Sequence, residues 1–238
     1  MGIFAAMNKR DLCKGLQVTG DVLVCILFVV LDALAVGVLS KTWTLEASPG
    51  RLALHRWLAI GFFAFLPLLL IPRMRRNLQW LMKFTHEFTH LLFALLFFRK
   101  IHRFKVDDQD SYVSFSDGWF GYHAITLSPY CIPVFVLVLL PWRFTTDSAQ
   151  SLYLADIDGL IGLSYAFHLA CWISQIHLKQ TDITGPGTVK SLLIIAFFQI
   201  VTFCLVVLTP GSGVQLAFER VFSIFPAEVF RAFQACCF

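Results

Sequence analysis

The residues best suited to chemistry are two histidines and a glutamate in the stretch Phe84-Thr85-His86-Glu87-Phe88-Thr89-His90. Residues four positions apart in an α-helix lie about 40° apart around the axis and about 6 Å apart along it, so the imidazoles of His86 and His90 can reach one ion. This is the HExxH zinc-binding arrangement, which leaves Glu87 free to act as a general base on water. The spacing predicts a Zn²⁺ site with His86 and His90 as two of its ligands.

The three ionisable groups stand in the apolar run from Leu78 to Phe98. Two imidazoles and a carboxylate surrounded by lipid cost several kcal/mol unless something compensates, and a bound metal is one such compensation. The alternative is a polar cluster that hydrogen-bonds neighbouring helices. Three ionisable groups within five residues favour the metal site over that structural cluster.

The composition is that of a membrane protein. Of 238 residues, 58% are hydrophobic and only 14% are charged, and 25 are phenylalanines. Several apolar runs approach the roughly 20 residues that a helix needs to cross a bilayer, so we expect an all-α polytopic fold. The net charge of +4 is spread over short loops with no basic stripe, which excludes a nucleic-acid-binding protein.

We expect about six transmembrane helices. They cover residues 22–39, 52–71, 78–98, 122–142, 154–176 and 188–208. The first is long for a cleaved signal and is expected to be retained, and the basic residues 72–77 are expected to form a short connection. This divides the chain into two N-terminal spans within residues 1–77, a core of four spans within 78–208, and a C-terminal amphipathic helix within 209–238 that lies on the bilayer surface.

A short β-hairpin is predicted at residues 100–116, directly after the HExxH helix. Residues 99–106 and 112–115 alternate polar with apolar side chains, and the acidic residues 107–110 between them favour a turn. The hairpin would offer a strand edge able to pair with an extended peptide backbone. It could equally be a simple connector, and the residues do not separate these two interpretations.

A catalytic zinc usually takes three protein ligands and leaves its fourth position to water, so the two histidines need a partner. The candidates are Asp158, His168, His177 and Asp182. Asp158 is expected at a similar depth in the membrane to His86, and Asp182 lies in the turn just beyond the fifth expected span. Membrane depth alone therefore allows either aspartate to be the third ligand. Asp158 could instead cap the start of its helix, and His168 could hydrogen-bond a neighbouring helix.

An HExxH motif in a transmembrane helix, followed by a short hairpin and two returning spans, resembles the site-2 protease family of intramembrane zinc metalloproteases. The likeness covers about Phe84 to Leu208, and the Thr181-Asp182-Ile183 segment is similar to that of small bacterial members. In this family the third ligand is an aspartate near the far end of the third core helix, which the resemblance places at Asp182. The glycine that directly follows that aspartate in the family's standard variants is replaced here by Ile183.

The resemblance implies a zinc-dependent peptidase, in which Glu87 is catalytic and His86, His90 and Asp182 bind the metal. Its substrate would be a membrane protein or peptide, cleaved within or beside the lipid bilayer. Its location would be a bacterial inner (plasma) membrane. Two other functions fit the same residues: a membrane metal-binding or transport protein, and a zinc hydrolase that acts on lipid.

Overall fold

The computed structural model describes residues 9–46, 55–107, 110–116, 118, 120–148, 153–177 and 180–237. Helices dominate this part of the chain, and three of them are long and apolar enough to cross a membrane. Two bent helix pairs raise the number of candidate spans to five at most. A helical membrane protein is therefore confirmed, whereas the expected count of six spans is not.

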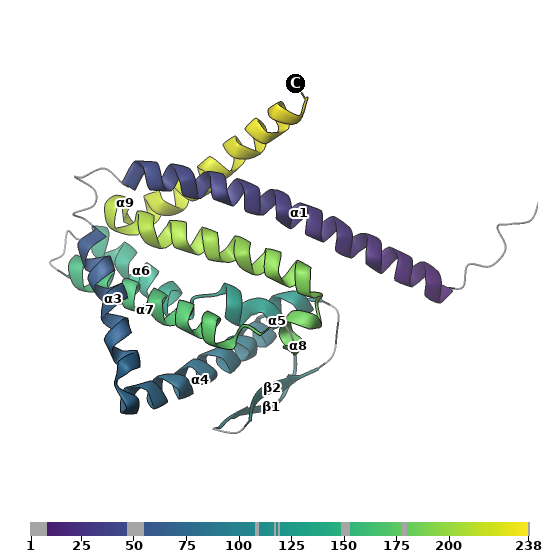
Figure 1. Ribbon diagram of the computed structural model, residues 1–238, viewed down its shortest axis with the longest axis horizontal. Coiled ribbons are helices and arrows are strands. Elements are labelled where there is room, and N and C mark those ends of the chain that lie inside the picture. The colour runs from purple at the N-terminus through teal and green to yellow at the C-terminus, as the bar shows by residue number, and fades with distance from the viewer. Residues whose placement is uncertain are drawn as a thin grey trace, which may run out of the picture.

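Two long helices lie side by side along one edge of the bundle (Figure 1). These are α1 (Lys9–Glu46) and α9 (Thr188–Cys237). We expected a span that ends at residue 208, but the helix continues past it and leaves the bundle at an angle (Figure 1). Ala217 and Val221 are buried together with Val38 of α1, so the first turns of the predicted surface tail pack against protein. Its surface position beyond them remains a prediction.

Helices α3 (Arg56–Leu70) and α7 (Leu154–Gln175) pack in backbone contact. A Cβ atom placed on Gly61 would lie 2.8 Å from the Cα of Gly159, and one on Gly162 would lie 2.9 Å from the amide nitrogen of Phe62. Small residues allow such close approach where no hydrophobic effect drives helices together. The contact between these two helices therefore depends on glycine at both positions.

The HExxH helix is not a separate antiparallel span. Helix α4 (Pro72–Leu96) follows α3 after a single residue, Ile71, and the two helices are bent by 111° (Figure 1). The expected basic connection at residues 72–77 was wrong, because these residues form the first turns of α4. Proline is favoured at the first helical position, where its missing N–H costs nothing, and Pro72 begins α4 there.

The fourth expected span is also broken. Helices α5 (Tyr122–Cys131) and α6 (Val134–Ser148) are bent by 74°. Ile132 between them has the extended backbone that a residue before proline prefers, here imposed by Pro133. The break turns the carboxyl end of α5 toward the interior of the bundle, where Tyr130 and Cys131 are buried.

The predicted hairpin is confirmed. Strands β1 (Ile101–Val106) and β2 (Ser111–Phe115) pair antiparallel directly after α4. The short helix α8 (Thr181–Thr184) lies at the same end of the bundle (Figure 1). The hairpin and α8 thus frame the part of α4 that carries the HExxH motif.

Replacing Gly61 with alanine should destabilise the protein by about 1–3 kcal/mol, because the added methyl group collides with the α7 backbone and forces the helices apart. The measurement is the apparent Tm of the purified protein in detergent. Gly20→Ala is the matched control, since nothing lies within 4 Å of an added Cβ there and alanine favours a helix. Equal Tm values for the two variants would contradict the proposed contact.

Candidate metal centre

His86 and His90 lie on one buried face of α4. Each residue is only 8% exposed, and their Nε2 atoms are 3.2 Å apart. Thr85 precedes His86, and Thr89 lies between the two histidines. The hydroxyls of both threonines donate hydrogen bonds to helix carbonyls one turn earlier. The helix therefore presents two imidazole nitrogens to a common point, as the four-residue spacing predicts.

Asp182 brings a carboxylate to the same point from α8. Its Oδ2 atom lies 3.3 Å from Nε2 of His86 and 3.4 Å from Nε2 of His90. Ile183, fully buried, anchors α8, and its carbonyl accepts a hydrogen bond from the hydroxyl of Ser191 at 3.0 Å. The chain then turns into α9 at Gly187, whose φ of +106° favours glycine.

The three ligand atoms match the dimensions of a tetrahedral zinc site. Bonds of about 2.0–2.1 Å at tetrahedral angles place neighbouring ligand atoms roughly 3.3 Å apart. The observed separations run from 3.2 to 3.4 Å. The Nδ1 atom of His90 donates to the carbonyl of Ile125 at 2.8 Å, so Nε2 is the nitrogen that faces the common point and that would bind a metal once it is deprotonated. His86, His90 and Asp182 are thus a donor set that fits zinc.

The electrostatics favour an ionised carboxylate at position 182. Burial alone raises the pKa of the Asp182 carboxyl, but the hydrogen bonds and charges of His86 and His90 outweigh it and hold the pKa well below its ordinary value. The side chain is therefore a carboxylate at neutral pH. Only this ionised form is a good ligand for a hard divalent cation.

A cleft of about 270 Å³ connects this group with the hairpin. Glu87 lines the cleft beside the two histidines and Asp182, and its side chain is only partly buried. Strand β2 lines the same cleft with Ser111, Tyr112, Val113 and Phe115. Ligands, a candidate base and a strand therefore border one cavity.

Tyr130 is a neighbour of the site that the sequence analysis missed. Its hydroxyl donates to Oδ2 of Asp182 over a long 3.4 Å, and its ring meets that of His86 edge to face, with centroids 5.2 Å apart. Its backbone carbonyl accepts a 2.6 Å hydrogen bond from Gln199 of α9. No spacing relates Tyr130 to the HExxH motif. The sequence feature that could have identified Tyr130 is its place within an apolar run, because a buried tyrosine hydroxyl needs a hydrogen-bond partner.

The other candidate ligands lie elsewhere in the described structure. Asp158 is not a helix cap but forms a buried ion pair with Arg143, whose Nε lies 2.7 Å from its Oδ1. The Nε2 atom of His168 is 2.9 Å from Nε2 of Gln199, which matches the structural alternative for that histidine. His177 is exposed at the end of α7. Of the four candidates, only Asp182 meets the two histidines.

The chain matches a protein-family model. Residues 58–231 match the model of the family described as Peptidase M50B-like, and this stretch includes α4, the hairpin and α8. No curated protein and no solved structure matches the chain. The family match covers well over half of the 238 residues and agrees with the resemblance to site-2 proteases. The chain belongs to the Peptidase M50B-like family of membrane metalloproteases.

Proposed function

We propose that the protein is a zinc-dependent peptidase that cleaves membrane proteins or peptides within or beside the bilayer. His86, His90 and Asp182 hold the metal, and Glu87 is the general base. The observation that supports this assignment most strongly is the convergence of the three ligand atoms within 4.8 Å at a cleft that Glu87 also lines. A location in a bacterial inner membrane is proposed from the likeness to small bacterial site-2 proteases alone.

A zinc ion held by these residues would supply a Lewis acid that activates water and polarises a peptide carbonyl. Glu87 accepts a proton from the attacking water through its carboxylate. It then returns the proton to the amine nitrogen as the peptide C–N bond breaks. Asp182 and the two histidines keep their positions throughout, because each is held by its own helix and by the contacts described above.

Strand β2 favours a peptide as the substrate. The carbonyls of a transmembrane helix are engaged in intrahelical bonds, so a substrate must unwind before it is cleaved. Strand β2 is one edge of a two-stranded sheet and lines the cleft together with the ligands and Glu87. An unwound segment can add to such an edge through main-chain hydrogen bonds, with side chains read only loosely. Neither lipid hydrolysis nor metal transport would require a strand edge beside the ligands.

Glu87→Gln should retain zinc and the fold but lower peptide hydrolysis by roughly 10²–10⁴-fold, because an amide cannot accept the proton. The measurement is turnover of a helical transmembrane peptide by the purified protein, together with its zinc content. Parental turnover in a variant with full zinc would rule out Glu87 as the base.

Asp182→Asn should reduce zinc affinity by more than about 100-fold. Loss of a residue that contacts only the ligands, and not the metal, costs roughly 10–100-fold. A neutral amide oxygen is a poor substitute for a carboxylate beside a divalent ion. Asp158→Asn is the matched control: it should lower thermal stability, because the buried guanidinium of Arg143 loses its counter-charge, while zinc binding stays intact. Zinc titrations of both variants check this, and the reverse pattern would make Asp158 the ligand.

Tyr130→Phe should weaken zinc binding by about tenfold or less while it leaves the fold unchanged, because only one long hydrogen bond to Asp182 is lost. Tyr165→Phe removes a hydroxyl from a tyrosine buried in the α6–α7 core and should leave zinc affinity unchanged. The comparison uses a competing chelator. Equal zinc affinities in the two variants would show that Tyr130 does not position the carboxylate.

A further inference from the structure

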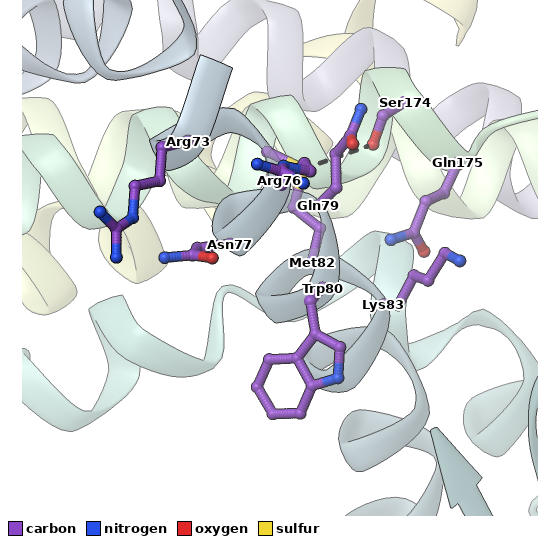
Figure 2. A pocket seen from close by; sticks show the side chains of 9 residues that line it. All are labelled: Arg73, Arg76, Asn77, Gln79, Trp80, Met82, Lys83, Ser174 and Gln175. Atoms are coloured by element: carbon purple, nitrogen blue, oxygen red, sulfur yellow. Dashed lines mark hydrogen bonds between the residues drawn. The ribbon is translucent and has the colours of Figure 1, made fainter. Parts of the chain in front are cut away.

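A second cavity, of about 810 Å³, lies at the start of α4 and the end of α7, outside the cleft that holds Glu87 (Figure 2). Figure 2 shows that most of the lining residues come from α4, with Ser174 and Gln175 contributed by α7. Arg73, Arg76 and Lys83 supply three cationic side chains. None of the described residues that line the cavity is acidic. The cavity is therefore strongly electropositive.

Arg73 and Arg76 are exposed, and their position on α4 favours an anion nearby. Arg73 and Arg76 stand in the first two turns of α4, whose first turn holds no acidic residue. The positive end of the helix dipole repels them there, as each repels the other. Among the residues that the structure describes, no hydrogen bond or ion pair engages either guanidinium. A bound anion would relieve both repulsions.

An apolar groove of about 560 Å³ continues from this cavity. The cavity and the groove share Gln79, Met82 and Ser174 as common walls. The groove follows α3 and α7 away from the basic cavity, with Phe62 and Ala166 among its lining residues. The helices α3 and α7 that line the groove belong to candidate membrane-spanning segments, so an acyl chain is a chemically suitable occupant of its apolar part. The combined site is amphiphilic along its length.

We propose that the cavity and the groove together bind one anionic phospholipid. Its phosphate lies among Arg73, Arg76 and Lys83, and an acyl chain lies in the groove between α3 and α7. Both volumes fall within the roughly 300–1,000 Å³ that is usual for small-molecule sites. An acidic protein segment would neutralise the cations but leave the apolar groove unfilled. The bound lipid would contact α4 at Met82 and Lys83, about one turn before His86, and so brace the helix that carries the HExxH motif.

The test uses the fluorescence of Trp80, which lines the basic cavity and is 45% exposed. The full chain is reconstituted in phosphatidylcholine bilayers with increasing fractions of brominated phosphatidylglycerol or brominated phosphatidylcholine. The signal of Trp80 is the difference between the parent and Trp80→Phe. Brominated phosphatidylglycerol should quench this signal at a much lower fraction than brominated phosphatidylcholine, because only the lipid with a net negative charge neutralises Arg73 and Arg76.

The double variant Arg73→Gln/Arg76→Gln should raise the required fraction of brominated phosphatidylglycerol by about thirtyfold, as expected for two cations near a lipid surface. Arg56→Gln/Lys100→Gln is the matched control, since it removes the same charge from exposed positions outside the cavity and should change nothing. Equal quenching by the two lipids would overturn the proposal, because the basic cavity would then not select an anionic lipid. A preference for phosphatidylglycerol that survives Arg73→Gln/Arg76→Gln would also overturn it, because the preference would then be general surface attraction.

Discussion

The fold brings one carboxylate oxygen and two imidazole nitrogens to 3.2–3.4 Å from one another, and this requirement accounts for several irregular features of the chain. Groups of this kind are expensive inside an apolar helix bundle unless a cation or a full set of hydrogen bonds compensates. Each ligand residue is therefore held in position by contacts with its neighbours. The carbonyl of Ile125 holds His90, the ring of Tyr130 meets that of His86, and the buried Ile183 anchors the helix that carries Asp182.

The breaks in the helices help to bring the three ligand atoms together. The bend at Ile71 turns α4 away from α3, and Met82 then packs in the same cluster as Phe65 and Phe167 of the α3–α7 pair. The break before Pro133 ends α5 beside the site, which places Tyr130 against His86 and Asp182. The α3–α7 pair, in backbone contact through its glycines, is the rigid support on which α4 rests. Straight antiparallel spans would not bring these groups together.

The predictions that rest on local periodicity were reliable. The four-residue spacing of His86 and His90, the alternation in the hairpin, and the apolar run of α7 each depend on near neighbours in the chain, and the structure shows all three. One error concerns a local signal and the other concerns long-range packing. The basic residues 72–77 were predicted to be a loop, although Pro72 is a favourable helix start. The partner of Asp158 is Arg143 on a neighbouring helix, which no spacing within one helix could identify.

X-ray absorption at the zinc edge of the purified protein can show whether two imidazoles and one carboxylate bind a zinc ion. We expect one zinc per chain with only nitrogen and oxygen neighbours at about 2.0–2.1 Å, and outer-shell scattering from two imidazole rings. A sulfur neighbour at about 2.3 Å would contradict this expectation, because none of the proposed ligands carries sulfur. Scattering from three imidazole rings would also contradict it, since a third histidine would then occupy the position assigned to Asp182.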